Sequence, residues 1–424
     1  MSRLSSRSTA DNKTSTGLHV LADAASAPTA NKIPSNLVPP MFRAVSLIAQ
    51  TLLLCLVGYN AVTALWGWRD RVPAQTGSRQ RRLKVVIPAH NEERVVGRLL
   101  ADLTASDYPH EQVSLWVLAD RCTDATIDVA TEAGAKVARR ADGTPGKGAA
   151  LAWYLREHPL TSDESLVVFD ADNRVGPEVL GRIADELDAG HDAVQCYLDV
   201  ANPDASPLAE ASALSYWASN RMVQLARSNL GWSADLGGTG MGFSAELLQH
   251  VGGFEDSLTE DQELGARIVL VGRRVEWLHD VKIHDEKPTS VGVTMRQRAR
   301  WITGKRAASR AHLSDLLRAG NPAALDQAVR LVQPGRMFVA LVSGILTAVS
   351  VSTGSSWLLP WSVWGTATAI QVLGPLPFLA RDGVPSRRLL RYPLLIVLAA
   401  LWLPIRVLSS RVGHWYHTPH GDKQ

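Results

Sequence analysis

Two aspartates at the end of an apolar run are the first residues of this sequence that could do chemistry. The run Leu166–Phe169 has no polar alternation, which favours a strand buried on both faces of a parallel sheet. Asp170 and Asp172 follow it directly, so they would lie at the carboxyl edge of the sheet, where open α/β folds bind ligands. Two carboxylates there suit a divalent cation that also binds substrate phosphates. Alternatively, both acids solvate a loop and cap a helix that begins near Pro177.

Other predicted strands bring polar residues to the same edge. The candidates, which follow the strands near 84–88 and 115–118 or precede the next helix, are Ala89, Asn91, Glu92, Asp120 and Lys147. Polar groups that converge from successive strand ends are what a nucleotide pocket requires. Asp120 could instead form an Asx turn, and Lys147 could be a solvated loop lysine. The sequence around Lys147 is not a P-loop, because the spacing GxxxxGK[ST] is absent.

Three later segments add further candidates. They are the glycine-rich run 237–243, which contains Gly240, the acidic Thr259-Glu260-Asp261, and Gln297-Arg298-Ala299-Arg300-Trp301. Four glycines in six residues allow a backbone to approach a ligand closely, or to turn tightly between strands. Acidic side chains at the start of a helix also interact favourably with the helix dipole. This interaction alone would explain the presence of Glu260 and Asp261.

The composition describes a central α/β domain between apolar ends. The 424 residues have a net charge of +3, which is too small to indicate a basic surface for binding nucleic acid. The three cysteines show no CxxC spacing, so we expect neither a disulfide framework nor a zinc site. Strand and helix patterns alternate over 83–295, which predicts a mostly parallel, Rossmann-like sheet. Residues 1–40 are rich in Ser, Thr, Ala and Pro and predict a disordered tail.

Apolar segments long enough to cross a bilayer flank this domain. Residues 44–68, 337–353 and 357–380 are predicted transmembrane helices. Arginines follow the first of them, so the positive-inside rule predicts a multi-pass protein of the cell membrane with a cytoplasmic central domain. Residues 296–335 are basic and amphipathic, which predicts interfacial helices. The apolar run within 389–410 is short, which favours a re-entrant or interfacial segment over a fourth transmembrane segment.

Four motifs in order along the chain resemble those of the membrane-embedded family 2 glycosyltransferases. They are Asp120, Asp170-Ala171-Asp172, Thr259-Glu260-Asp261 and Gln297-Arg298-Ala299-Arg300-Trp301. This group includes the synthases of cellulose, chitin, hyaluronan and poly-N-acetylglucosamine, and ceramide glucosyltransferase. The resemblance covers roughly 83–305. It is weaker in the tail 411–424, where Trp415, Thr418 and His420 are similar to a gating motif whose usual basic residue is here a histidine.

The resemblance implies a GT-A fold, a nucleotide-sugar donor that is usually UDP-linked, and Mg²⁺ or Mn²⁺. It implies that Asp261, with Glu260 beside it, is the general base, that Asp170 and Asp172 hold the metal-bound diphosphate, and that Asp120 contacts the nucleotide base. The candidate donor-binding residues are Ala89, Asn91, Glu92, Asp120, Lys147, Asp170, Ala171 and Asp172. Those for the acceptor and the leaving diphosphate are Gly240, Gln297, Arg300 and Trp301. Trp301 could instead be an interfacial anchor.

These features predict an inverting transferase that extends a β-linked polysaccharide at the cytoplasmic membrane face. The alternative is transfer of one sugar to a membrane lipid, which needs no product channel. Three spans are few for a channel unless the chain forms a homo-oligomer. A phosphohydrolase with a DxDx[TV] motif is excluded, because Arg174 stands at its last position. A non-catalytic membrane scaffold is disfavoured, because every acidic position of the motifs is filled.

Overall fold

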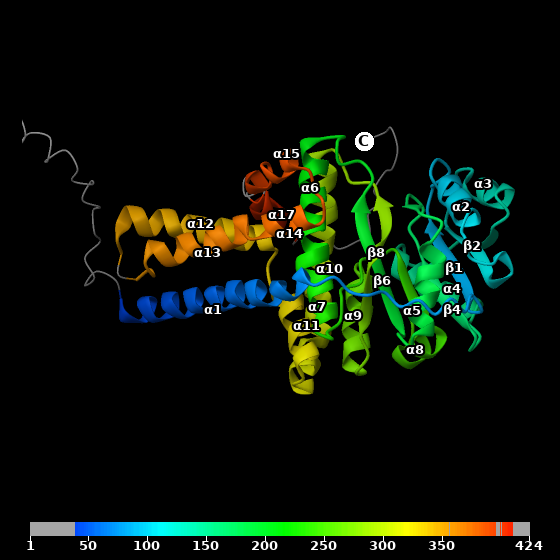
Figure 1. Cartoon of the computed structure of the whole chain (residues 1–424), viewed down its shortest axis with the longest axis horizontal. Helices are drawn as coiled ribbons and strands as arrows, with labels where there is room; N and C mark the ends of the chain where they lie inside the picture. The colour runs from blue at the N-terminus through cyan, green and yellow to red at the C-terminus, as the bar shows by residue number, and fades with distance from the viewer. Residues whose placement is uncertain (1–38, 356, 396–398, 400, 410–424) are drawn as a thin grey trace, which may run out of the picture.

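An eight-stranded sheet lies at the centre of the α/β domain, and long helices project from one side of it (Figure 1). The computed structural model describes residues 39–355, 357–395, 399 and 401–409. The strands are β1 (Arg82–Ala89), β2 (Val113–Asp120), β3 (Lys136–Arg140), β4 (Glu164–Val168), β5 (Arg174–Val175), β6 (Ala193–Val200), β7 (Met241–Ser244) and β8 (Val275–Asp285). Their order in the sheet is β3-β2-β1-β4-β7-β6-β8-β5.

Most neighbouring strands are parallel, as the sequence predicts. β1 pairs in parallel with β2 and β4, β2 with β3, and β6 with β8. β7 pairs antiparallel with both β4 and β6, and β5 antiparallel with β8. The glycine-rich run thus leads into a central strand. A Cβ at Gly242 would lie 2.8 Å from side-chain carbons of Ile183 and Val194, so the strand fits there only with glycine.

Helices cover both faces of the sheet. One layer consists of α2 (Val96–Thr104), α3 (Thr126–Glu132) and α5 (Val179–Asp188), and the other of α4 (Lys147–Glu157), α8 (Ala245–Val251) and α9 (Glu260–Leu270); a short turn, η4 (His110–Gln112), precedes β2. Side chains of β1 alternate between the two cores. Val85 and Ile87 pack into the cluster with α2 and α5, and Val86 into the cluster with α4 and α9. Burial of both faces explains the continuous apolar runs of the central strands.

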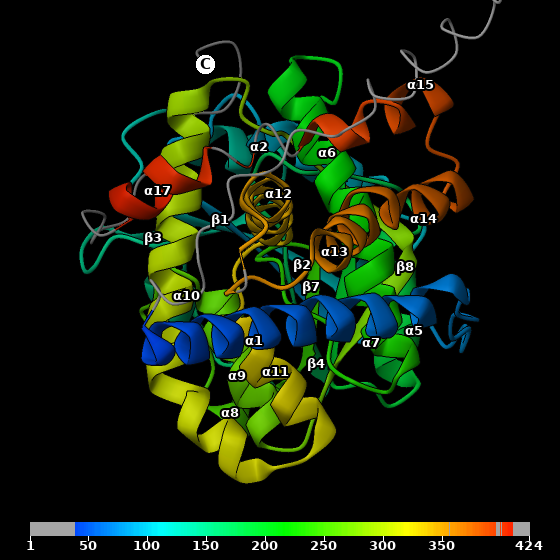
Figure 2. The same ribbon diagram turned by 90° about the vertical axis from the view of Figure 1, so that its left-hand side faces the viewer.

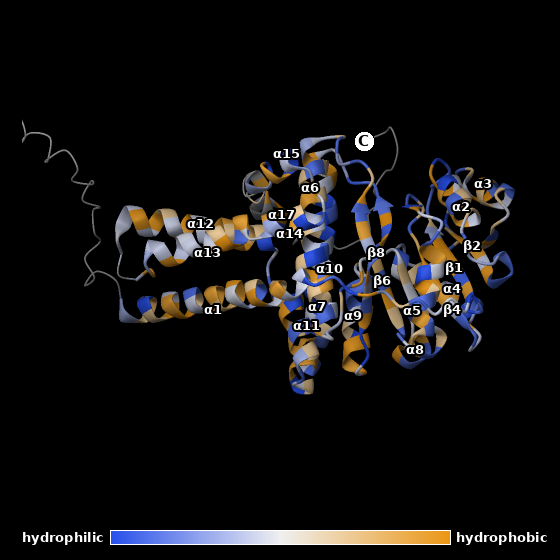
Figure 3. Ribbon diagram, in the orientation of Figure 1, coloured by the Kyte–Doolittle hydropathy of each residue, from blue (hydrophilic) through white to orange (hydrophobic). Residues whose placement is uncertain are grey.

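Three helices in the described part of the chain are long and apolar enough to cross a membrane. They are α1 (Pro40–Ala64) with η3 (Leu65–Trp68), α12 (Arg336–Thr353), and α13 (Trp361–Leu373) with α14 (Pro375–Arg381). They lie side by side and point away from the sheet, with apolar residues along their length (Figure 3). They match the three predicted transmembrane segments.

A column of helices separates this bundle from the sheet, and its axes run across those of the bundle (Figures 1 and 2). It contains α6 (Pro207–Ser219), η5 (Asn220–Leu225), α7 (Ala226–Asn229), α10 (Val291–Ala319) and α11 (Pro322–Val332). α10 and α11 thus cover most of residues 296–335, although α10 begins earlier, at Val291, and 320–321 and 333–335 are not helical. α10 and α11 pack on α9 through a core that includes Ala266, Ala308 and Leu316. They lie between the bundle and the sheet, and their interfacial role stays a prediction.

The region 389–410 contains only short helices where the structure describes it. They are α15 (Ser386–Leu389), η6 (Tyr392–Leu394) and α17 (Trp402–Leu408). The predicted tail at 1–40, except for its last two residues, lies outside the described residues. So does the segment 411–424 with its gating candidates Trp415, Thr418 and His420.

Candidate active site

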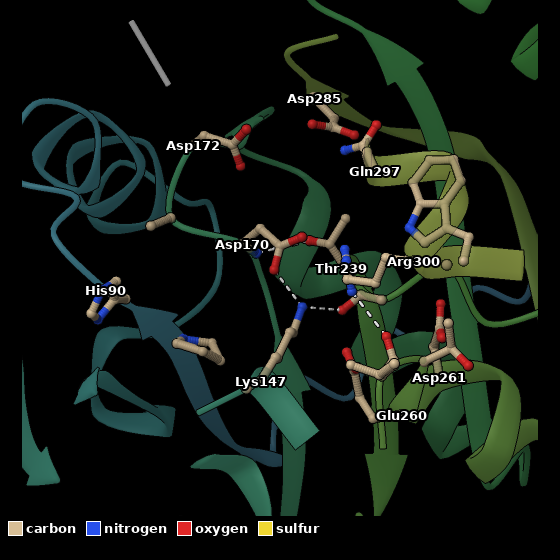
Figure 4. Close-up of a pocket in the computed structure, with 18 of the residues that line it drawn as sticks. His90, Lys147, Asp170, Asp172, Thr239, Glu260, Asp261, Asp285, Gln297 and Arg300 are labelled. Carbon is tan, nitrogen blue, oxygen red and sulfur yellow. Dashed lines mark hydrogen bonds and ion pairs between the residues drawn. The ribbon is translucent and has the colours of Figure 1, made fainter. Parts of the chain in front are cut away.

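A cavity of about 220 Å³ opens at the carboxyl ends of β1, β2, β4 and β8 (Figure 4). The starts of α4 and α9, the turn before β7, and α10 complete its walls. Its lining includes the charged or amide side chains of Glu92, Asp120, Lys147, Asp170, Asp172, Glu260, Asp261, Asp285, Glu286, Lys287, Gln297 and Arg300, together with Ala89, Ala171 and Trp301. Carboxylates from distant parts of the sequence therefore meet in one cavity.

Lys147 links the first aspartate of the pair to the turn before β7. Its Nζ forms an ion pair with the Asp170 carboxylate and donates a hydrogen bond of 2.6 Å to the carbonyl oxygen of Gly238. Burial lowers the pKa of Lys147, but the carboxylates of Asp170, Glu260 and Asp261 outweigh it and raise that pKa. Lys147 is therefore a fixed cation in the middle of the cavity.

Asp172 lies in a strongly acidic part of the wall. Burial raises its pKa well above the usual value, and the carboxylates of Asp285, Asp170 and Glu92 raise it further. No group of three or more His, Cys, Asp or Glu side chains in the described residues is arranged to hold a metal. Asp170 and Asp172 offer two carboxylates, so a divalent cation bound here would need further oxygen ligands from a substrate.

Glu260 and Asp261 form the first turn of α9. Burial and the neighbouring Glu260 carboxylate raise the pKa of Asp261 to about 7, against the opposing effect of Lys147 and Arg300. Gly148 allows α4 to approach this turn, because a Cβ there would lie 2.3 Å from the carbonyl oxygen of Glu255 and 2.9 Å from the Cβ of Glu260. A carboxylate with a pKa near neutrality can accept a proton from a substrate hydroxyl.

α10 closes the cavity on the side of the three membrane-length helices. Gln297, Arg300 and Trp301 line the cavity together, because residues three and four apart share a face of a helix. Arg300 Nη1 donates a hydrogen bond of 2.9 Å to the carbonyl oxygen of Leu258, immediately before Thr259-Glu260-Asp261. At Gly304, one turn further, a Cβ would lie 2.4 Å from the Thr259 hydroxyl. The missing side chain therefore lets α10 pack directly against the start of α9.

Comparison with known proteins identifies the family of this chain. Residues 80–304, more than half of the sequence, match the family model described as "Glycosyltransferase like family 2". The chain belongs to glycosyltransferase family 2. The resemblance of its motifs to that family is thereby confirmed.

Curated relatives and a solved structure extend this family 2 match. Beta-monoglucosyldiacylglycerol synthase of Nostoc sp. is 29% identical over 238 residues, which are 52% of this chain and 48% of that protein. Probable glycosyltransferase YdaM of Bacillus subtilis is 28% identical over 238 residues, 53% and 55% of the two chains. This chain thus spans about half the length of the curated relatives it matches.

Among solved structures, the mannosyltransferase PcManGT from Pyrobaculum calidifontis, in complex with GDP-Man and Mn²⁺, superposes with a TM-score of 0.56. It is 19% identical, and the match covers 84% of this chain and 98% of that chain. At this identity the likeness shows the fold, and it confirms the predicted GT-A arrangement with a mostly parallel sheet.

Two residues predicted for the family 2 site lie outside the cavity lining. Asn91 Oδ1 accepts a hydrogen bond of 2.7 Å from the backbone N–H of Thr123, so it fastens the loop after β1 to the loop after β2. The carbonyl oxygen of Gly240 accepts a hydrogen bond of 2.8 Å from the N–H of Cys196, where the chain enters β7. Both residues shape the loops around the cavity, and their contact with donor and acceptor stays a prediction.

Asp120 lines the cavity but is already engaged by arginines. Its two carboxylate oxygens accept from Arg140 Nη1 and Arg121 Nη2, each at 2.7 Å. Arg140 also donates to the carbonyl oxygen of Thr144, so the acid steadies the loop that leads to Lys147.

The sequence analysis missed several residues of the site, among them Thr239, Asp285 and Lys287. Thr239 accepts a hydrogen bond of 2.9 Å from the backbone N–H of Asp170 and fixes the loop that holds the acid pair. Lys287 forms an ion pair with Asp285 beside Asp172. Burial lowers the pKa of Lys287, but Asp285 outweighs it and raises that pKa. Asp285 ends β8, so the strand-end rule that selected Asp120 would also have found this pair.

Proposed function

We propose that this chain transfers one hexose from a nucleotide sugar to a hydroxyl group of a membrane lipid, with inversion at the anomeric carbon. The observation that supports this best is the position of Asp261, a half-buried carboxylate with a pKa of about 7 near Lys147 and Arg300. A base poised near the working pH contributes about 10²–10⁴-fold to a proton transfer.

In the proposed step Asp261 accepts the proton of the acceptor hydroxyl as that oxygen attacks the anomeric carbon. The bond from this carbon to the diphosphate oxygen breaks, and its electron pair leaves with the nucleoside diphosphate. Lys147 and Arg300 are the cations of the cavity on the side of Asp261, and they would offset the negative charge that grows on the leaving group. A planar guanidinium such as that of Arg300 can contact two phosphate oxygens at once.

A divalent cation, Mg²⁺ or Mn²⁺, fits the acid pair. Asp170 and Asp172 supply hard oxygen ligands in a wall with surplus negative charge, and the donor diphosphate would supply more. Bound there, the cation would neutralise phosphate charge as a Lewis acid. The proposal is also supported by the fold neighbour, which was solved with GDP-Man and Mn²⁺.

The names of the relatives support a lipid acceptor over a growing polysaccharide, which reverses the preference of the sequence analysis. Three relatives, from Nostoc sp., Trichormus variabilis and Synechocystis sp., are beta-monoglucosyldiacylglycerol synthases at 28–29% identity, whereas the probable glucomannan 4-beta-mannosyltransferases match at 24–25% identity. The structure adds an apolar cavity of about 360 Å³ between α1, η5, α12 and α13. This volume is within the range of ligand pockets, and most of the lining residues belong to the membrane-length helices.

The proposed location is the cell membrane, with the α/β domain in the cytoplasm. Arg69, Arg71, Arg79, Arg81 and Arg82 follow the first membrane-length helix, and basic residues on the domain side of a span favour that side. Nucleotide sugars are made in the cytoplasm, so the donor would reach the cavity directly.

The test is to size the product. The full-length chain in vesicles that contain diacylglycerol is given radiolabelled UDP-glucose, UDP-N-acetylglucosamine or GDP-mannose, and the products are separated by thin-layer chromatography and gel filtration. We expect a single lipid-soluble product that contains one sugar. A ladder of long chains would instead show a polysaccharide synthase, and the absence of transfer from every donor would refute the proposed reaction.

A further inference from the structure

A second lysine reaches the catalytic cavity beside the acid pair, and the proposed reaction gives it no role. Lys287 follows β8, lines the cavity and is 6% exposed. Its Nζ forms an ion pair with Asp285, which contributes more to the raised pKa of Asp172 than any other carboxylate does. Asp172 and Asp285 lie toward one end of the cavity and Asp261 toward the other (Figure 4). The ammonium group of Lys287 therefore lies in the part of the wall where the divalent cation is proposed to bind.

Backbone and side-chain contacts hold this lysine in place. Asn202 Oδ1 accepts a hydrogen bond of 2.8 Å from the backbone N–H of Lys287, and Asn202 Nδ2 donates one of 2.9 Å to its carbonyl oxygen. Lys287 Nζ lies 4.1 Å from the centre of the Tyr216 ring, within the range of cation–π attraction. Tyr216 belongs to α6 and lines the same cavity. The ammonium group therefore leaves the acid wall only if it loses these contacts.

A buried lysine at the opposite edge of the sheet has a different charge balance. Lys84 of β1 is 8% exposed and forms an ion pair of 3.0 Å with Glu164, at the amino ends of the strands. One cation meets one acid there. Lys287, by contrast, interacts with both Asp285 and Asp172. Its single charge leaves this part of the wall negative, but less negative than the carboxylates alone would make it.

We propose that the ammonium group of Lys287 weakens divalent-cation binding at Asp170 and Asp172, so that the cation is retained only when the donor diphosphate adds its own oxygens. This role rests on the proposed function, because it requires the cation site at the acid pair. Two positive charges repel each other, and the repulsion is stronger in a protein cavity than in water. The diphosphate offsets it, because it supplies oxygen ligands and negative charge to the cation. Lys287 thus acts on the affinity for the cation and not on the transfer step itself.

The test measures Mn²⁺ binding in the absence of any nucleotide. Lys287→Met removes the charge, Lys287→Arg keeps it, and Lys84→Met removes the other buried lysine as the matched control. Each full-length protein in detergent micelles at pH 8 is titrated with Mn²⁺, and electron paramagnetic resonance measures the free ion. We expect K287M to bind Mn²⁺ about tenfold more tightly than the wild type or better, and K287R and K84M to bind it as the wild type does.

Thermal stability gives a second readout. Without metal the Tm of K287M should lie below that of the wild type, because Asp285 loses its partner. Mn²⁺ should raise the Tm of K287M more than that of the wild type, whereas K84M should lose stability that Mn²⁺ does not restore. If K287M does not fold, Lys287→Gln keeps a hydrogen-bond donor for Asp285, and we expect the same gain in Mn²⁺ affinity from it.

The double variant K287M/D172N locates the bound ion and should lose the gain in affinity. If it keeps the gain, Mn²⁺ binds elsewhere and the proposal is wrong. Equal Mn²⁺ affinities of the wild type and the uncharged Lys287 variants would overturn the role of Lys287 and leave the cation site standing. If no variant binds Mn²⁺, with or without UDP or GDP, both the cation site and the role of Lys287 are wrong.

Discussion

Two buried clusters of charge in this molecule have opposite balances. Around Asp326, whose side chain is 0% exposed, Arg227 of α7 donates at 3.0 Å, and the Tyr59 hydroxyl of α1 donates as well. Arg330, one turn further along the helix of Asp326, forms an ion pair with it at 2.9 Å. Arg330 also forms an ion pair with Asp235. Each charge there has a partner of the opposite sign. In the catalytic cavity the acids outnumber the cations, and burial together with the neighbouring carboxylates raises the pKa values of Asp172 and Asp261.

The difference separates a structural site from a ligand site. The Asp326 cluster joins α1, α7 and α11, so it fixes the first membrane-length helix to the α/β domain. Its charges are satisfied within the protein, and removal of one leaves the others buried without compensation. The catalytic cavity keeps surplus charge because a cation and a substrate are expected to neutralise it. Variants in the first cluster should therefore change stability, and variants in the second should change activity.

The largest effect is expected for Asp261→Asn. Without the base, turnover should fall by about 10²–10⁴-fold, while donor binding remains. The Tm at pH 8 should not fall, since the folded protein raises the pKa of Asp261 and its ionised form therefore costs stability as the pH rises through 7. Single-turnover kinetics measure the loss of turnover, and calorimetric titration measures donor binding. More than a tenth of wild-type turnover would contradict the assignment.

Removal of the divalent cation should have the second largest effect. Excess chelator is expected to abolish transfer, and Mg²⁺ or Mn²⁺ to restore it, because Asp170 and Asp172 would otherwise face the donor diphosphate with like charge. Activity is measured before chelation and after readdition of metal. Full activity in chelator would exclude a metal role for the pair.

Asp326→Ala should lower stability instead of catalysis. A buried ion pair that loses one partner typically costs about 3–5 kcal/mol, and here Arg227 would lose its partner while Arg330 would keep only Asp235. Thermal unfolding of the solubilised protein measures the effect. If the variant kept its Tm but lost transfer at low temperature, the cluster would belong to the active site and the comparison would fail.

The dependence of activity on pH should report the base. Asp261 must be ionised to accept a proton, so kcat/KM should fall about tenfold per pH unit below 7 and level off above it. In D261N this decrease in kcat/KM below pH 7 should disappear. A wild-type profile that stays flat down to pH 5 would contradict the assignment of Asp261.

The smallest effect is expected where both charges are exposed. Arg318 and Asp315 form an ion pair of 2.7 Å with side chains 75% and 52% exposed. Arg318→Ala should change stability by no more than about 1 kcal/mol and leave transfer unchanged. This variant calibrates the D326A result, and a loss of Tm as large as that of D326A would show that burial does not separate the two.

The sequence predicted those residues whose place follows from local pattern. Asp170 and Asp172 follow an apolar strand, and the edge of a parallel sheet brings such strand ends together. Asn91 and Gly240 were chosen because their type suits a ligand contact, whereas their hydrogen bonds with Thr123 and Cys196 could be known only from the fold.

The most direct test of the proposed chemistry is the configuration of the new glycosidic bond. A single displacement with Asp261 as base must invert the anomeric carbon, so an α-linked nucleotide sugar should yield a β-linked glycolipid. Nuclear magnetic resonance of the purified product distinguishes the two anomers by the coupling of the anomeric proton when the sugar is glucose. A β-linked product, lost in D261N, is the expected result, and an α-linked product would contradict the account.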